Sequence, residues 1–180
     1  MRRSIRAFDQ TVQKLVDRLP RSLSPTMLFF TLIGQPPFTV GIAAVTFGYG
    51  WALELPHYLW AGATAIGTIV VVSLLKLVLR RPRPSNDYVR HMLIQTFSFP
   101  SGHAAGALVS YGLAATIIGF LWPPFAIVAW IVAIIIVALV SLSRVYLQAH
   151  YASDIIGGWL VGGVGLALIV VEFLFVTGSL

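Results

Sequence analysis

Residues 100–122 read PSGHAAGALVSYGLAATIIGFLW, a short polar sequence that leads into an apolar run without Asp, Glu, Lys or Arg. A helix crosses a hydrocarbon core of about 30 Å with roughly 20 residues, so the run at 103–122 is long enough to span a membrane. Further apolar runs lie at 38–54, 58–80, 125–143 and 154–178. The chain is 58% hydrophobic and only 10% charged, unlike a soluble domain. We therefore predict an all-α, polytopic membrane bundle of about five transmembrane helices.

The first 21 residues have a different pattern. Apolar and basic side chains alternate there at helical spacing: the apolar set is Ile5, Phe8, Val12, Leu15, Val16 and Leu19, and the basic set is Arg2, Arg3, Arg6, Lys14 and Arg18. Segment 1–21 is therefore predicted to be an amphipathic helix in the membrane interface. The run 26–33 is too short to span, and Gly34-Gln35-Pro36-Pro37 follows it, so we expect a short interfacial or re-entrant helix. We treat 1–180 as one domain whose membrane bundle is 26–180.

The distribution of charge indicates the class of partner. The net charge is +6, and six of the twelve Lys and Arg residues lie in the first 21 positions. The other six lie in or next to three short motifs at the ends of apolar runs. This arrangement favours a membrane surface or an anionic lipid headgroup over nucleic acid. The chain has no cysteine, which excludes a disulfide framework and a thiolate metal site.

The first motif is Lys76-x6-Arg83-Pro84. Arg81 and Arg83 each precede a proline, which disfavours helical backbone, so the helix at 58–80 should end near Arg80. Lys76 then lies in its last turn, and Arg83 lies on an extended segment that can fold back over it. The alternative reading is a basic anchor beside the membrane.

The second motif is Pro100-Ser101-Gly102-His103, at the entrance to the helix expected from 103. Backbone N–H groups at a helix start lack intrahelical acceptors, and glycine allows a phosphate to approach them closely. His103 is placed to give or take a proton at the bound group. A plain turn with an interfacial histidine is the alternative.

The third motif is Ser143-Arg144-x5-His150-x3-Asp154. His150 and Asp154 share a helix face if the last helix begins early, and Asp154 lies in its first turn if Ser153 caps it. In either case the carboxylate can hold one ring nitrogen of His150 and leave the other as a nucleophile. Arg144 can bind a phosphate bidentately. A structural ion pair between His150 and Asp154 is the alternative.

Counting the passes places all three motifs on one face of the membrane. The loops 81–102 and 144–153 share that face with the amino terminus, and the turns at Pro56 and Pro123-Pro124 lie on the other. A zinc site is disfavoured because the two motif histidines lack a third neutral ligand, and the nearby cations would repel a metal ion. We expect a site without metal or cofactor.

With its three motifs in order over 76–154, the chain resembles the type 2 phosphatidic acid phosphatase (PAP2) superfamily, also called the lipid phosphate phosphatases. The resemblance implies a helical membrane bundle that hydrolyses a phosphate monoester or diphosphate on a lipid. It implies that His150 forms a phosphohistidine, that Asp154 orients it, and that His103 protonates the leaving oxygen and then activates water. The phosphate oxygens would be held by Lys76, Arg83, Arg144 and the N–H groups near Ser101 and Gly102.

The substrate and the side of the membrane follow less directly from the resemblance. Undecaprenyl-diphosphate specialists often carry Asp where this chain has Gly102, so phosphatidylglycerophosphate or phosphatidic acid is favoured, with undecaprenyl diphosphate and lipid A phosphate open. Arg80, Arg81 and Arg90 are candidates for recruiting the headgroup. Related sites usually face outward, and the positive-inside rule points to the cytoplasm. We give the resemblance more weight and expect a plasma or inner membrane protein with an extracytoplasmic site.

Two other functions remain open from the sequence. A phosphotransferase would pass the phosphoryl group from His150 to a lipid hydroxyl instead of water. A lipid-binding or scrambling protein would keep the pocket without turnover, but the presence of both motif histidines and Asp154 argues against it. The oligomeric state is left open.

Overall fold

The computed structural model describes residues 2–91, 96–176 and 178, and all regular structure in these ranges is helical. Five helical stretches are long and apolar enough to cross a membrane: Arg21–Ala52, Pro56–Leu79, Gly102–Leu121, Pro123–Tyr146 and Ala152–Val176. The predicted all-α bundle with five spans is therefore confirmed.

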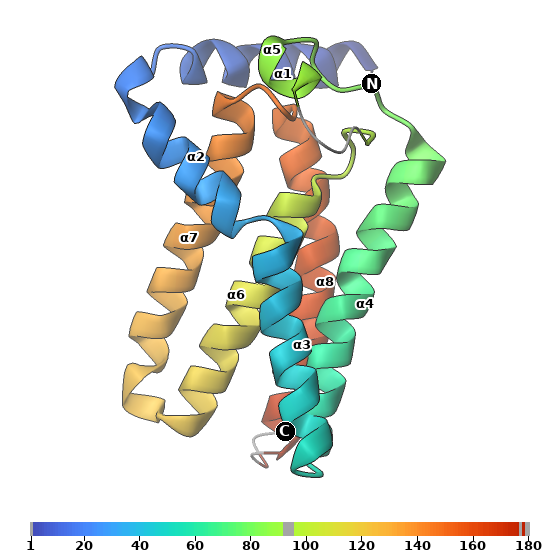
Figure 1. Cartoon of the computed structure of the whole chain (residues 1–180), viewed down its shortest axis with the longest axis vertical. Coiled ribbons are helices and arrows are strands. Elements are labelled where there is room, and N and C mark those ends of the chain that lie inside the picture. The colour runs from blue at the N-terminus through green and yellow to red at the C-terminus, as the bar shows by residue number, and fades with distance from the viewer. Residues whose placement is uncertain (1, 92–95, 177, 179–180) are drawn as a thin grey trace.

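The first of these stretches consists of two helices, which corrects the interpretation of 26–33. α2 (Ser24–Ile33) follows the short 3-10 helix η1 (Arg21–Leu23) and leads into α3 (Pro36–Ala52). Figure 1 shows that α2 and α3 follow one another down the bundle, so α2 is neither re-entrant nor a separate interfacial helix. The 17 residues of α3 reach only about 25 Å, and α2 supplies the rest of the crossing. The break lies at Gln35, which is extended (ψ 155°) and precedes Pro36.

The remaining spans begin or end where prolines and polar motifs require it. α4 (Pro56–Leu79) begins at a proline, whose missing N–H costs nothing in the first turn. It ends as predicted, because Arg80 adopts a left-handed conformation (φ 46°) before the two Arg-Pro pairs. α6 (Gly102–Leu121) and α7 (Ala126–Tyr146) form a hairpin through the 3-10 helix η2 (Pro123–Phe125). α8 (Ala152–Val176) completes the bundle, and the four-residue helix α5 (Asp87–Arg90) lies in the loop between α4 and α6.

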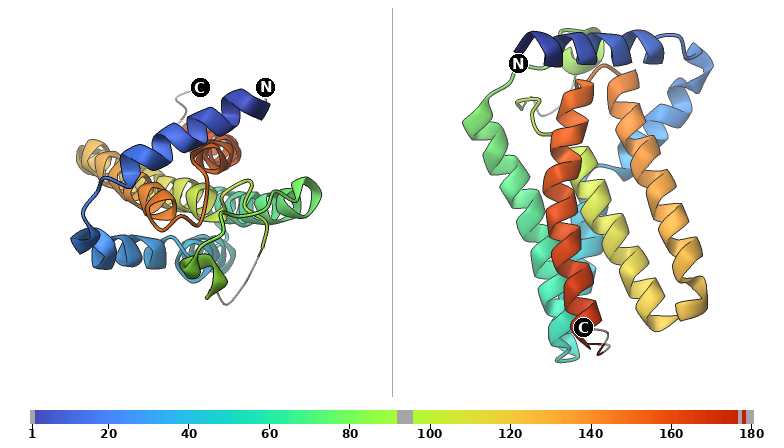
Figure 2. Two further views of the ribbon diagram at one scale, coloured as in Figure 1. Left: turned by 90° about the horizontal axis from the view of Figure 1, so that it is seen from above. Right: turned by 180° about the vertical axis from the view of Figure 1, so that it is seen from behind.

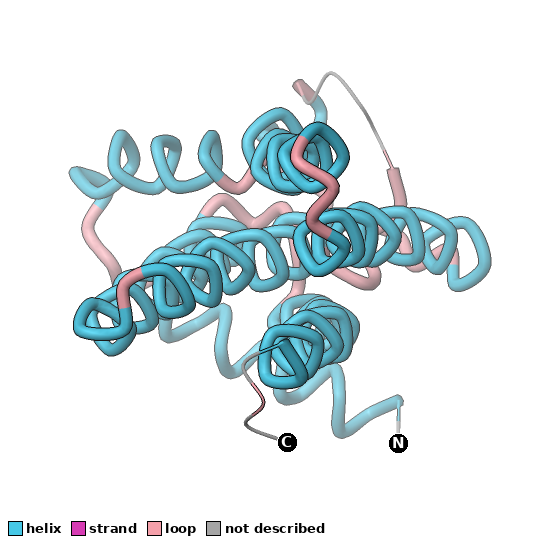
Figure 3. The backbone as a smooth tube through the Cα atoms, turned by 90° about the horizontal axis from the view of Figure 1, so that it is seen from below, coloured by secondary structure: helices cyan, strands magenta, loops and turns pink. Residues whose placement is uncertain are grey.

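The helices form three layers around α6. Views along the bundle show α7, α6 and α4 in the middle layer, α2 and α3 on one side and α8 on the other (Figures 2 and 3). α6 packs against α3, α4, α7 and α8. The amphipathic helix α1 (Arg2–Val16) lies across one end of the bundle, over α7 and α8 (Figure 2). This end carries all three motifs, as the count of passes predicts.

Two glycines of α8 determine how closely α8 and α6 approach. A Cβ atom on Gly158 would lie 2.6 Å from the Ser101 carbonyl oxygen, and one on Gly162 would lie 2.8 Å from the Ala105 carbonyl oxygen. Both distances are too short for a real side chain. The contact brings the amino-terminal ends of α6 and α8 together, and the Ser101 N–H donates to the Asp154 carbonyl oxygen at 2.9 Å.

We predict that Gly162→Ala destabilises the protein by about 1–3 kcal/mol, because the added methyl group meets backbone that cannot rotate away. The matched control is Gly67→Ala on α4, where a Cβ atom meets nothing within 4 Å. That control should be neutral or slightly stabilising, because alanine favours helix. Thermal unfolding in detergent measures both, and equal melting temperatures for the two variants would contradict the packing argument.

Candidate active site

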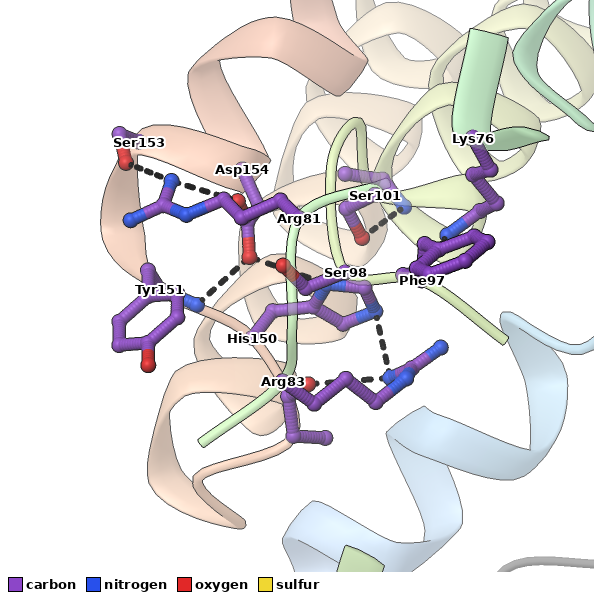
Figure 4. Close-up of polar contacts among 12 residues, drawn as sticks. Lys76, Arg81, Arg83, Phe97, Ser98, Ser101, His150, Tyr151, Ser153 and Asp154 are labelled. Atoms are coloured by element: carbon purple, nitrogen blue, oxygen red, sulfur yellow. Dashed lines mark hydrogen bonds and ion pairs between the residues drawn. The ribbon is translucent and has the colours of Figure 1, made fainter. Parts of the chain in front are cut away.

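The structure brings the three motifs together at the end of the bundle that α1 crosses (Figure 1), and Figure 4 shows residues from each motif in one close-up. The first motif comes from the end of α4 and the segment after it. The second forms the start of α6, and the third joins the end of α7 to the start of α8. Residues up to 78 positions apart, such as Lys76 and Asp154, therefore act on one another electrostatically.

The carboxylate of Asp154 lies in the first turn of α8, which begins at Ala152 rather than at a Ser153 cap. Its Oδ2 accepts a hydrogen bond from the Tyr151 N–H at 2.9 Å, as an acidic residue at the third helical position often does. The same oxygen lies 3.4 Å from Nδ1 of His150. The Asp154 side chain is completely buried, so this carboxylate is fixed by its neighbours.

The ring of His150 is 1% exposed and lies between Asp154 and Arg83. Arg83 Nη1 lies 3.2 Å from Nε2 of His150, and because a guanidinium only donates, Nε2 is the unprotonated nitrogen. Burial and the charges of Arg83, Arg144 and Lys76 hold the pKa of His150 well below its usual value of 6.5. The ring is therefore neutral at physiological pH, with the lone pair on Nε2 and the proton on Nδ1. Nδ1 lies 3.4 Å from Asp154 Oδ2 and makes no hydrogen bond with any residue the structure describes.

Arg83 remains charged in this setting. Burial and the charge of Arg144 lower the pKa of Arg83 to about 10. Its guanidinium also donates to the Ala149 carbonyl oxygen at 3.0 Å and to the Thr96 carbonyl oxygen at 2.7 Å. These bonds hold it on the extended segment after α4, as predicted, where it touches the histidine.

Arg144 is fully buried in the last turn of α7 and has one free edge. Its Nη1 donates to Thr31 Oγ1 and to Tyr88 Oη, both at 3.2 Å. Its Nε and Nη2 are buried and make no hydrogen bond with any residue the structure describes. These two groups form one edge of the guanidinium, the edge that binds two oxygens of a phosphate side by side.

Lys76 and the start of α6 form another wall. Lys76 is 8% exposed, and its Nζ donates to the Phe97 carbonyl oxygen at 2.9 Å. Gly102 lies beside it, because a Cβ atom on Gly102 would be 3.7 Å from Lys76 Cε. Ser101 caps α6: its hydroxyl accepts from the Ala104 N–H at 3.4 Å. The Ser101 N–H is already bonded to the Asp154 carbonyl oxygen, so the N–H groups of the first turn that remain for a ligand are those of Gly102 and His103.

His103 completes the group from the first turn of α6. Its Nε2 is buried and has no hydrogen-bond partner among the described residues. The charges of Arg144, Arg83 and Lys76 act on its ring, as does His150. In the described part of the chain, none of these three cations makes an ion pair. The site thus has two buried cations, Lys76 and Arg144, the half-buried Arg83, two imidazoles and free donors, an arrangement suited to a tetrahedral anion.

Four residues around the site were not predicted as parts of it. Thr31 and Tyr88 hold Arg144, and nothing in their local sequence indicates this. Asp9 and Arg81 form an ion pair at 2.7 Å beside Asp154. Asp9 did carry a signal, because it shares the apolar face of 1–21, where an acidic residue needs a partner. Arg81 was expected to recruit headgroups, but it points inward to these two carboxylates instead.

Comparisons with known proteins agree with the geometry. A family model for the PAP2 superfamily matches residues 57–176. Undecaprenyl-diphosphatase BcrC of Bacillus subtilis is 29% identical over 157 residues, which cover 85% of this chain and 73% of that protein. Phosphatidylglycerophosphatase B of Bacillus subtilis is 26% identical over 167 residues, or 88% and 80% of the two chains. The undecaprenyl-diphosphatase of Sulfolobus acidocaldarius is 35% identical over 129 residues, 59% of either chain.

A solved structure has the same fold. The crystal structure of a transmembrane PAP2 type phosphatidylglycerolphosphate phosphatase from Bacillus subtilis matches with a TM-score of 0.72 and 24% identity, over 98% of this chain and 86% of that one. The family match begins in α4 and ends with α8, so it contains every motif of the site. The resemblance noted in the sequence is confirmed, and the chain belongs to the PAP2 superfamily of membrane phosphatases.

Proposed function

We propose that this protein hydrolyses a phosphate monoester or diphosphate on a membrane lipid, through a phosphohistidine at His150 and without a metal ion. The observation that carries the proposal is the free edge of Arg144, whose Nε and Nη2 are buried without a partner in the described part of the chain. Buried charged donors cost free energy when unsatisfied. A phosphate supplies two acceptors at the spacing of that edge, so an anionic substrate explains it better than a structural role.

In the first proposed step, the lone pair on His150 Nε2 attacks phosphorus in line with the bond to the lipid oxygen. The N–P bond forms as that P–O bond breaks, and His103 gives its proton to the leaving oxygen. The negative charge of the bound phosphate favours the protonated form of His103 needed for this step. Asp154 offsets the positive charge that develops on the ring of His150.

In the second step, His103 takes a proton from a water molecule, whose oxygen attacks phosphorus from the side that the lipid oxygen has left. The N–P bond breaks, inorganic phosphate leaves and His150 returns to its neutral form. In both steps Lys76, Arg83 and Arg144 hold the equatorial oxygens, where the transition-state charge collects. Three fixed cations supply the charge neutralisation that Mg²⁺ supplies in many other phosphoryl transfers, and they repel a metal ion.

We propose a glycerophospholipid substrate, either phosphatidylglycerophosphate or phosphatidic acid, with undecaprenyl diphosphate as the main competitor. Gly102 supports this choice, because undecaprenyl-diphosphate specialists often carry Asp at the matching position. The relatives divide between the two classes by name. Lipid A phosphate is a third candidate, and the four lipids together form the panel for the assay.

The decisive assay measures phosphate release from this lipid panel by detergent-solubilised protein in EDTA, with no acceptor lipid added. We expect release by the wild type and none by His150→Ala, because no other group can form the phosphoenzyme. Rapid quenching should trap an acid-labile, alkali-stable phosphoprotein in the wild type only. Full activity of His150→Ala would contradict the nucleophile, and strong inhibition by EDTA would contradict a metal-independent site.

Arg144→Lys tests the free guanidinium edge. The charge is kept and the two parallel donors are lost, so kcat/KM should fall on the order of 100-fold. A matched control is Arg80→Lys at the end of α4, where the exposed side chain donates to the Leu77 carbonyl oxygen and to no other residue that the structure describes. It should keep wild-type kinetics. Equal activity of both variants would show that charge alone suffices at position 144.

We also propose that the site faces out of the cytoplasm, in a plasma or inner membrane. Because the chain has no cysteine, single-cysteine variants report sidedness cleanly. Ser85→Cys lies in the exposed segment beside the site, and Leu53→Cys lies in the turn at the opposite end of the bundle. A membrane-impermeant maleimide added to intact cells should label the first variant and spare the second. The reverse pattern would place the site in the cytoplasm.

A further inference from the structure

The amphipathic helix α1 carries one carboxylate that is buried rather than solvated. Asp9 is 5% exposed, whereas Asp17, one residue past the end of α1, is exposed. Oδ1 of Asp9 accepts from the Ser153 N–H at 2.8 Å, and Oδ2 accepts from the Ser153 hydroxyl at 2.9 Å. Oδ2 also accepts from Arg81 Nη2 at 2.7 Å. Asp9 therefore binds the segment after α4 and the first turn of α8 at once.

Arg81 extends this group of contacts to the site. Its Nη1 donates to Asp154 Oδ1 at 2.8 Å and to the Ser153 hydroxyl at 2.7 Å. Its guanidinium also lies over the ring of Tyr151, 4.2 Å from the centroid. Figure 4 shows Arg81 and Ser153 on the side of Asp154 that is away from Lys76. Arg81 thus binds one oxygen of Asp154, and His150 faces the other.

The summed charge of Asp9, Arg81 and Asp154 determines the electrostatic potential at the ring of His150. Arg81 alone would neutralise Asp154, and a neutral pair offers little stabilisation to a positive phosphohistidine. Asp9 supplies a second negative charge on the far side of Arg81. The three side chains Asp9, Arg81 and Asp154 then carry a net charge of −1. Both carboxylates are buried and Arg81 is 26% exposed, so water screens these charges less than it does at the surface. The Asp154 carboxylate, which faces His150, can therefore still stabilise a positive charge on the ring.

We propose that Asp9 is a positioning residue for the reaction: it holds Arg81 in place and offsets its charge, so that Asp154 can orient His150 and stabilise the phosphohistidine. The inference rests on the proposed function, because it assigns Asp9 a role in that mechanism. The inference goes beyond the proposed function because it makes α1, which lies outside the three motifs, a part of the catalytic arrangement. Asp9 does not touch the phosphate site, so its effect should fall on the chemical step rather than on substrate binding.

The test is Asp9→Asn, which keeps the size of the side chain, removes its charge and replaces one of its two acceptor oxygens with an NH2 donor. We expect kcat to fall roughly 10-fold or more while KM stays within about twofold of wild type. Asp17→Asn is the matched control, because within the described ranges the Asp17 carboxylate bonds to Gln13 and Gln148 alone. It should leave both constants unchanged. Rates are measured well below the melting temperature, since a loss of folded protein would lower the apparent kcat for a different reason.

A second variant separates the charge effect from a loss of structure. In the double variant Asp9→Asn with Arg81→Gln, the glutamine amide can still donate to Asp154. The negative charge of Asp9 and the positive charge of Arg81 are removed together, so neither leaves an unpaired partner. We expect kcat of this double variant to recover to within about threefold of wild type. Failure of Asp9→Asn to reduce kcat, or a double variant no more active than Asp9→Asn, would overturn the inference. If Asp9→Asn does not fold, kcat of the double variant decides alone.

The proposed function fails separately from this inference. A wild type that releases no phosphate from any lipid of the panel contradicts the function itself. An active wild type with a fully active Asp9→Asn contradicts only the role of Asp9. Higher activity in Asp9→Glu than in Asp9→Asn would further support the charge argument, because the longer carboxylate keeps the negative charge beside Arg81.

Discussion

The site depends on one hydrogen bond between two helix starts, from the Ser101 N–H to the Asp154 carbonyl oxygen at 2.9 Å. The bond forms only because Gly158 and Gly162 let α8 press against the backbone of α6. It brings His103, the proposed acid–base residue at the start of α6, close to His150, the proposed nucleophile, and to Asp154 at the start of α8. The amino-terminal ends of two helices meet there, and each contributes partial positive charge. The same packing that joins the helices therefore also creates an electropositive centre.

An excess of positive charge near the membrane raises the free energy of the folded protein. The structure limits this cost by pairing one cation with carboxylates, while the other three contact neutral acceptors. Arg81 is matched with carboxylates at 2.7 and 2.8 Å. Lys76, Arg83 and Arg144 have only neutral acceptors within the described ranges. In the proposed function a bound phosphate would offset the repulsion among the three cations, so affinity for the anion would come at the expense of stability in its absence. Such local conflict between stability and charge is typical of functional sites.

The sequence reveals what lies within short segments and misses what depends on long-range packing. The end of α4 near Arg80 follows from the local rule about residues before proline, so this prediction is confirmed. The four-residue spacing also indicates that Asp154 lies near His150, at 3.4 Å, but α8 begins at Ala152, so His150 precedes the helix and Ser153 does not cap it. Thr31 reaches Arg144 across 113 positions, and Asp9 reaches Ser153 across 144. No spacing rule connects such pairs. Asp9, the buried acid on the apolar face of α1, was the one residue whose position indicated a long-range partner. That partner could not be deduced, because several basic residues were equally available.

The break in the first span shows why local rules also failed there. Gly34, Gln35 and two prolines predict an interruption, and the structure has one, but an interruption does not say where the two helices go. Packing decides that: α2 lies against α7, so Thr31 meets Arg144 and Ser143. A Cβ atom on Gly34 would lie 2.5 Å from Val140 Cγ1 and 3.4 Å from His103 Cδ2. Both contacts come from one face of α2, because Thr31 and Gly34 lie three positions apart before the break at Gln35. The break then lets α3 turn away from α7 and pack against α4 and α6, which a single straight helix along α7 could not do.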